Sequence, residues 1–307
     1  MANISAKDVA ELRRQTGCGM MDCKNALVAA NGNFDEAIKV LREKGMAAAA
    51  KKADRIAADG LVEILTEGNV TAMVEVNSET DFVAKNESFR ALVVTILKTI
   101  IAKKPATVEE LMACTTENGD TVEAAVQEKI LTMGEKLSIR RFLTVEGLVS
   151  TYIHGNGATG VIIKFEADDA AASNPGFAEF AKNIALQAAA YNTPYVNKEA
   201  VPASVIEEEK AILMKQMEAD PKMANKPAKV LEGIITGRLG KFFEANCLTE
   251  QAYVKDDSLT VAKYVAASAK EFGGSIAVVG AYRFDKGEGI QKREDDLAAE
   301  VAKMVKG

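Results

Sequence analysis

The sequence predicts an α+β protein with small antiparallel sheets, in which helical segments are interrupted by pairs of β-strands. Hydrophobic residues recur at helical spacing in several separate segments. Two pairs of short β-rich runs, each joined by a turn that contains glycine, stand between these segments. Hydrophobic residues make up 48% of the 307 residues and charged residues 27%, a composition typical of a globular protein with a buried core.

The first 45 residues predict three short helices that form a small separate unit. Ser5 and Asp8 have the spacing of a capping box at the start of the first helix. The third helix begins near Phe34, and we expect it to end at Gly45. Residues 46–58 consist mostly of alanine, lysine and arginine, and they predict a helical linker.

The central part of the chain repeats one pattern twice. Residues 61–65 and 71–76 predict a β-hairpin, and residues 89–101 then carry apolar side chains at helical spacing over more than three turns. Residues 148–153 and 161–166 predict a second hairpin, which is again followed by a helix that opens with phenylalanine. The two copies lie about 90 residues apart, so we expect a core of two related subdomains.

The last third of the chain is mainly helical. Residues 203–239 predict two helices of similar length with narrow apolar stripes, which together favour an antiparallel, coiled-coil-like hairpin projecting from the core. A further helix at 259–272, a strand at 275–284 and a polar helix at 291–305 complete the prediction. The expected parts are a docking unit with its linker at 1–54, a first core subdomain at 55–146, a second at 147–289 and a terminal module at 290–307.

Residues 155–160 satisfy the G-x-G-x-x-G pattern of dinucleotide-binding loops. That fingerprint requires a helix directly after the loop, because the helix N-terminus holds the pyrophosphate. Here Val161 to Phe165 has the composition of a strand. The pattern therefore indicates a glycine-rich hairpin turn, and we expect neither a bound nucleotide nor another cofactor.

Residue types further limit the classes of function. His154 is the single histidine, and the four cysteines form no C-x-x-C pair, so we expect no metal site and reduced thiols. The amino terminus lacks the apolar segment of a signal peptide, which favours a cytoplasmic protein. A net charge of −6 gives no basic field that would attract nucleic acid or an anionic membrane.

Two segments contain large apolar residues that could lie either in the core or at the surface. Met20 and Met21 are adjacent, so a helix cannot bury both equally, although the pattern alone favours core packing. In the second segment, Thr80 or Asp81 could cap the next helix, with Phe82 as a buried staple residue. This structural interpretation competes with a role in binding.

Both segments belong to a wider set of matches that keeps its order and spacing over nearly the whole chain. Residues 16–27 read Thr-Gly-Cys-Gly-Met-Met-Asp-Cys-Lys-Asn-Ala-Leu, and residues 80–85 read Thr-Asp-Phe-Val-Ala-Lys. Shorter matches are Ile139-Arg140-Arg141, Tyr152 with His154-Gly155, Gly237-Arg238 with Lys241-Phe242, and Gly287-Glu288-Gly289-Ile290. In these residues the chain resembles the bacterial elongation factor Ts family, the guanine-nucleotide exchange factors of elongation factor Tu. Cys18 and Asn25 depart from the commoner family residues, and residues 99–123 match poorly.

The resemblance implies a protein without a catalytic site of its own, which binds the GDP form of elongation factor Tu and promotes exchange of GDP for GTP. It implies that Thr80, Asp81, Phe82 and Val83 act near the partner's magnesium-binding region. It further implies that His154 acts on elements next to the partner's phosphate loop. The resemblance also assigns Arg13, Met20 and Met21 to docking of the amino-terminal unit, and it leaves open a higher-order complex through the helical hairpin.

Two alternatives remain open at the level of sequence. A hydrolase would need a nucleophile beside His154, for which Ser150 and Thr151 are the nearby candidates. A nonspecific scaffold would use only the three-helix unit and the helical hairpin, and it would bind several partners without accelerating GDP release.

Overall fold

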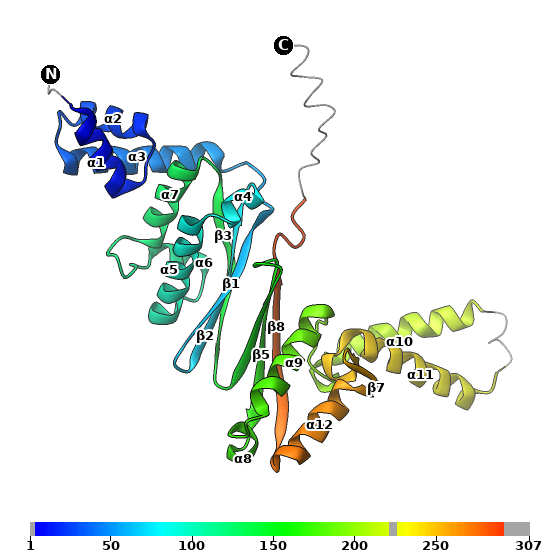
Figure 1. Ribbon diagram of the computed structural model, residues 1–307. Helices are drawn as coiled ribbons and strands as arrows, with labels where there is room; N and C mark the ends of the chain where they lie inside the picture. Colours follow the sequence, from blue (N-terminus) through cyan, green and yellow to red (C-terminus); the bar gives the residue numbers. More distant parts are fainter. Residues whose placement is uncertain (1–3, 221–225, 292–307) are drawn as a thin grey trace.

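The computed structural model describes residues 4–220 and 226–291, and these form the α+β architecture that the sequence predicts (Figure 1). Three helices open the chain, two three-stranded antiparallel sheets pack face to face in the centre, and a helical hairpin projects from one flank. The expected helix at 291–305 falls almost entirely on residues 292–307, outside the described residues.

The amino-terminal unit consists of α1 (Ala6–Thr16), α2 (Met20–Ala29) and α3 (Phe34–Lys52). Its predicted capping box is present, since the Ser5 hydroxyl accepts a hydrogen bond from the Asp8 amide and the Asp8 carboxylate accepts one from the Ser5 amide. The unit has a hydrophobic cluster of its own, composed of Val9, Leu12, Cys18, Cys23, Ala26, Leu27, Ala37 and Leu41.

The predicted end of the third helix at Gly45 is wrong, because α3 continues without interruption to Lys52. Gly45 is buried inside this helix. A Cβ atom at this position would lie 3.1 Å from the carbonyl oxygen of Gln127 in α7 (Val122–Met133). The glycine therefore allows two helices to pack closely, and α3 is both the last helix of the unit and its attachment to the core.

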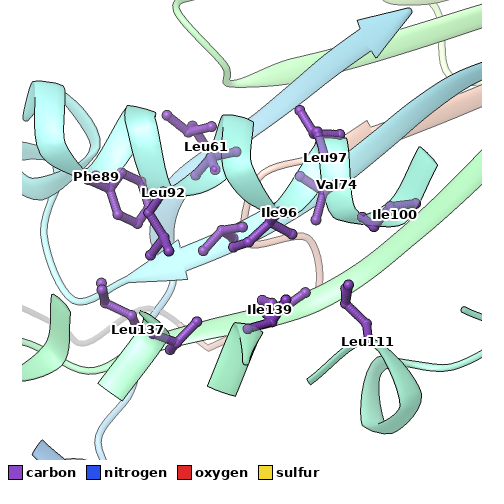
Figure 2. Close-up of a cluster of buried hydrophobic side chains, with 14 of the residues drawn as sticks. Leu61, Val74, Phe89, Leu92, Ile96, Leu97, Ile100, Leu111, Leu137 and Ile139 are labelled. Carbon is purple, nitrogen blue, oxygen red and sulfur yellow. The ribbon is translucent and has the colours of Figure 1, made fainter. Parts of the chain in front are cut away.

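The first core subdomain contains a sheet in the order β1 (Asp59–Glu67), β2 (Val70–Ser78) and β3 (Leu137–Glu146). Its helices are α4 (Asp81–Ala84), α5 (Glu87–Lys103), α6 (Val108–Ala113) and α7. Figure 2 shows the cluster in which Phe89, Ile96 and Ile100 of α5 meet Val74 of β2 and Ile139 of β3. The strong helical periodicity of residues 89–101 thus marks the face of α5 that covers the sheet.

The second subdomain contains a sheet in the order β4 (Val149–His154), β5 (Thr159–Ala167) and β8 (Ile276–Asp285). Its outer face is covered by α9 (Phe177–Ala190) and α12 (Val261–Phe272), and α8 (Asp169–Ala172) precedes α9. The short strands β6 (Ala252–Tyr253) and β7 (Asp256–Thr260) form a separate ribbon, so the expected helix at 259–272 begins two residues later than predicted. The 3₁₀ helices η1 (Lys198–Ala200) and η2 (Leu248–Glu250) lie in the connections.

The inner faces of the two sheets pack against each other, so the core has the order helices, sheet, sheet, helices. The cluster between the sheets contains Val62, Met73 and Val145 from the first sheet and Ile162 and Phe284 from the second. Adjacent residues in these strands point to opposite faces, and both faces are covered. This double burial explains why almost every residue of β2, and most residues of β5, are buried with little alternation along the strand.

The glycine-rich segment at 155–160 is the turn between β4 and β5, as predicted. Gly157 has a φ of +99°, and a Cβ atom there would lie 2.7 Å from the Cβ atom of Leu61. A Cβ atom on Gly160 would lie 2.5 Å from a methyl carbon of Val62. These two glycines allow the second sheet to approach the first, which accounts for the motif without a nucleotide.

The helical hairpin is formed by α10 (Ala203–Glu218) and α11 (Ala228–Asn246), and it projects from the second subdomain (Figure 1). Its second helix extends seven residues beyond the predicted boundary at 239. Leu213 and Met217 are buried, and neither belongs to the hydrophobic clusters of the core. Within the described residues, no helix has the length and apolarity needed to cross a membrane.

Candidate partner-binding site

The turn α4 exposes a large aromatic side chain at the edge of the first sheet. Phe82 is 79% exposed, whereas the next residue, Val83, is 8% exposed and belongs to the core cluster. Successive residues of a helix point in directions about 100° apart. In a single turn of four residues, two neighbouring side chains can therefore face the core while the other two face solvent. Val83 and Ala84 face the core, and Asp81 and Phe82 consequently face solvent.

This geometry decides between the two interpretations of Phe82 and places Val83 in the core. Phe82 is not a buried staple residue, because its ring lies outside the core. Val83, which the resemblance assigned to the partner-contact segment, is 8% exposed and anchors the turn from inside the core. Thr80 occupies the N-cap position, but its side chain does not cap α4, since its hydroxyl donates a hydrogen bond to Glu135.

Charged groups flank the exposed ring. Lys85 Nζ lies 2.6 Å from Asp81 Oδ2 and 5.8 Å from the centre of the Phe82 ring. The pKa of Asp81 is lowered from its ordinary value, chiefly by the hydrogen bond from Lys85 and further by the positive charge of Lys286. Asp81 therefore presents an ionised carboxylate beside Phe82 at neutral pH.

His154 is the last residue of β4, and its side chain is exposed. A hydrogen bond of 3.2 Å joins its Nδ1 to the Tyr152 hydroxyl. The carbonyl oxygen of His154 accepts hydrogen bonds from the amides of Gly157 and Ala158, which close the turn. His154 thus stands on a tightly bonded turn, with its ring oriented by the neighbouring tyrosine.

Contacts between distant segments bring α4 and the His154 turn to the same end of the molecule. The Val62 amide of β1 donates to the Gly157 carbonyl at 2.8 Å, and Arg90 of α5 donates to the Asn156 carbonyl at 3.3 Å. Lys286 donates its amide to the Ala158 carbonyl and carries the charge that acts on Asp81. The two predicted contact points are therefore held on one framework made from both subdomains.

The relative position of the subdomains is fixed by a buried carboxylate. Glu75 of β2 has no exposed side-chain surface. It accepts hydrogen bonds from Arg141 Nε at 2.7 Å, Arg140 Nη1 at 3.1 Å, the Gly287 amide at 2.8 Å and Asn77 Nδ2 at 3.1 Å. Gly287 follows β8, so this junction ties the end of the second sheet to the centre of the first.

The third group of predicted contacts lies in the three-helix unit, apart from α4 (Figure 1). Met20 and Met21 are 47% and 62% exposed at the start of α2, so the core packing that the pattern favoured for them is wrong. Cys23, Ala26 and Leu27 fill the interior side of that helix instead. Arg13, in the last turn of α1, is also exposed.

The surroundings of His154 do not favour the hydrolase alternative. Thr151 lies on the opposite face of β4, because alternate residues of a strand share a face. Ser150 shares the face of His154 but stands four residues away, about 13 Å along the strand, with Tyr152 between them. Among the described residues, no group of three or more histidine, cysteine, aspartate or glutamate side chains is placed to hold a metal ion.

Exposed apolar groups on a rigid framework are suited to contact with another macromolecule, and these features define a protein-binding factor. Residues 79–288 match the family model described as elongation factor TS. The chain is 45% identical over 308 residues to elongation factor Ts from Syntrophotalea carbinolica, a match that covers 99% of each sequence.

The chain belongs to the elongation factor Ts family. It is a translation elongation factor that promotes nucleotide exchange on elongation factor Tu, and the resemblance carried by residues 16–27 and 80–85 is confirmed.

Proposed function

We propose that the chain binds elongation factor Tu in its GDP form and releases GDP through two contacts on the same end of the core. In this proposal Asp81 and Phe82 disturb the magnesium-binding region of the partner, and His154 presses on elements next to its phosphate loop. The observation that carries the proposal is the 79% exposure of Phe82 on a turn that Val83 and Ala84 anchor in the core.

The physical basis is the way in which a GTPase holds its nucleotide. Backbone amides of the phosphate loop and a magnesium ion bind the phosphates, and magnesium tolerates little departure from octahedral geometry. Displacing either element weakens GDP binding without breaking a covalent bond. An aromatic ring and an imidazole on anchored turns can displace these elements, because the turns are already ordered and little conformational freedom is lost on binding.

Thermodynamic linkage sets the required strength. If the exchange factor lowers the affinity of the partner for GDP, GDP lowers the affinity for the exchange factor by the same factor. Each tenfold change corresponds to about 1.4 kcal/mol. The contacts at Phe82 and His154 therefore need to differ between the nucleotide-bound and nucleotide-free partner by only a few kcal/mol.

Docking supplies the remaining affinity in this proposal. Met20 and Met21 offer polarisable, adaptable side chains to an apolar patch, and Arg13 can pair with a carboxylate. The helical hairpin adds a further surface, either to the same partner or to a second Tu–Ts complex. A nonspecific scaffold would use these docking surfaces alone.

The test is a stopped-flow measurement of fluorescent GDP leaving elongation factor Tu, with and without the full chain. We expect strong acceleration by the wild-type chain and a loss of at least tenfold for His154→Ala at saturating concentration. Tyr282→Ala, which removes an exposed ring from β8, serves as the matched control. Unchanged acceleration by the His154→Ala variant would remove the histidine from the mechanism.

A further inference from the structure

The residues before the exposed turn are held by two crossed carboxylate contacts. Glu135 accepts hydrogen bonds from the Thr80 amide at 3.0 Å and from the Thr80 hydroxyl at 2.6 Å. In return, Glu79 accepts a hydrogen bond from the Lys136 amide at 2.6 Å. We call these four residues the crossed clasp.

The register of the sheet explains why the clasp forms. Ser78, the last residue of β2, is paired with Leu137, the first residue of β3. The strands are antiparallel, so the next two residues after Ser78 face the two residues before Leu137. In the clasp, side-chain carboxylates replace the backbone carbonyls that would continue the ladder. Gly134, which ends α7 with a φ of +76°, allows the chain to enter this position.

The clasp determines the direction of α4. This helix has only four residues, too few to be stable through its own hydrogen bonds. Besides the two bonds to Glu135, the Thr80 carbonyl accepts a hydrogen bond from the Ser78 hydroxyl at 2.8 Å. The polar groups of Thr80 are thus fixed on three sides, directly before Asp81 and Phe82. Without Glu135, the turn would keep the hydrogen bond from Ser78 and the burial of Val83 and Ala84, but the amide and hydroxyl of Thr80 would lose their carboxylate partner.

We propose that Glu135 is a positioning residue for nucleotide exchange, which acts through Thr80 to fix the direction in which the Phe82 ring leaves the core. This inference rests on the proposed function of Phe82. An anchored ring loses little conformational freedom on binding, whereas a turn that samples several directions must be ordered first. A displacement of about 1 Å at such a contact is enough to slow the assisted step by one or two orders of magnitude.

The experiment compares Glu135→Ala in the wild-type and Phe82→Ala backgrounds, using full-length protein and fluorescent GDP bound to elongation factor Tu. We expect Glu135→Ala to lower GDP release at saturating concentration by about tenfold in the wild-type background. In the Phe82→Ala background the same change should have less than about a twofold effect, because the group that it positions is absent. Glu135→Gln, which keeps one acceptor oxygen, should fall between wild type and Glu135→Ala.

The matched control is Glu146→Ala, which removes an exposed ion pair at the far end of β3 and should leave GDP release unchanged. Equal losses in both backgrounds would show a general structural effect and overturn the proposal.

A full effect of Phe82→Ala with no effect of Glu135→Ala would overturn the positioning role of Glu135 alone. Full activity of Phe82→Ala by itself would overturn the proposed function and the positioning role together. If Glu135→Ala does not fold, Thr80→Val replaces it in the same two backgrounds, with the same criteria.

Discussion

At the residue scale, Glu75 illustrates how a buried charge can hold two subdomains together. Its carboxylate contacts two arginines of β3 and the backbone of Gly287. Burial alone would raise the pKa of Glu75, but the hydrogen bonds from Gly287, Asn77, Arg141 and Arg140 outweigh burial and lower the pKa below its ordinary value of 4.5. The carboxylate is therefore ionised and fully bonded at neutral pH.

Replacing Glu75 with glutamine should lower the free energy of unfolding at pH 7 by about 2 kcal/mol or more, because two arginines lose their buried partner. The arginines are 28% and 30% exposed, so water partly replaces their lost partner, and the expected loss is smaller than the loss of about 3–5 kcal/mol for a fully buried pair. Glu146→Gln, in an exposed ion pair on β3, should change stability by less than about 1 kcal/mol. Equal losses of unfolding free energy for the two variants, measured by urea unfolding, would show that the buried carboxylate of Glu75 contributes no more than an exposed ion pair.

The same residue predicts a dependence on pH. A carboxylate whose pKa is lower in the folded protein stabilises it above the unfolded pKa, and this contribution is lost as pH falls through the folded pKa. The difference in unfolding free energy between wild type and Glu75→Gln should therefore be constant near pH 7 and shrink below about pH 4.5. Urea unfolding of both proteins at pH 7 and at pH 4 measures it. A difference that grows with acidity would reverse the assigned direction.

Sequence reasoning found the exposed turn but not its supports. The segment Thr80 to Lys85 was recognisable as a unit, yet its pattern fitted a buried staple as well as a binding turn, and only packing decides between them. Glu135 lies 55 residues from Thr80, and Gly287 lies 212 residues from Glu75. Contacts at such separation leave no local pattern in one sequence.

At the scale of elements, regular apolar spacing predicted the hairpins and α5, whereas α6, α7 and β3 received no prediction. The short helix α6 has six residues, too few for a periodic signal. In β3 the alternation is interrupted by a bulge opposite Glu75 and Val76, where two consecutive arginines turn toward Glu75. The irregularity that hides the strand from sequence analysis is thus the feature that forms the junction.

The helical hairpin gives a prediction at this scale. Among the described residues of the segment 205–236, the buried ones are Leu213 and Met217, and both lie outside the core clusters. This segment should therefore be replaceable by a short glycine-rich linker without loss of folding. Exchange should weaken because the complex is less stable, and saturating protein should largely restore the rate. Circular dichroism and a concentration series of GDP release measure both. Aggregation of the shortened chain would show that the hairpin belongs to the core.

At the scale of the whole molecule, the three-helix unit combines independence with a firm attachment. Its cluster is separate from the others, yet Ala48 and Ala49 at the end of α3 pack against the core, and Arg42 pairs with Asp120 at 2.8 Å. The linker expected from composition is therefore the final part of a packed helix, at least as far as Lys52. This arrangement keeps the exposed methionines in a defined orientation relative to the core.

Deletion of residues 1–54 should leave the core folded, with a cooperative but lower melting temperature, because α7 loses the helix that covers it. Affinity for elongation factor Tu should fall sharply, since the proposed docking residues are removed. Calorimetry and a binding titration measure the two effects. Full-strength binding by the shortened chain would exclude a docking role for the unit.

In the proposed function, Phe82 acts on the partner and does not stabilise this protein itself. A comparison of Phe82→Ala with Phe89→Ala tests this directly. Phe82 is 79% exposed and Phe89 is fully buried, so the two variants remove the same ring from the surface and from the core. Phe82→Ala should melt within about 1–2 °C of wild type. It should cost about 2 kcal/mol of coupling or more, and so slow stimulated GDP release by more than about tenfold. Phe89→Ala should lose about 3–5 kcal/mol of stability and retain exchange wherever it stays folded. Normal exchange by Phe82→Ala, together with a melting temperature lowered by several degrees, would show that Phe82 stabilises this protein and does not act on the partner.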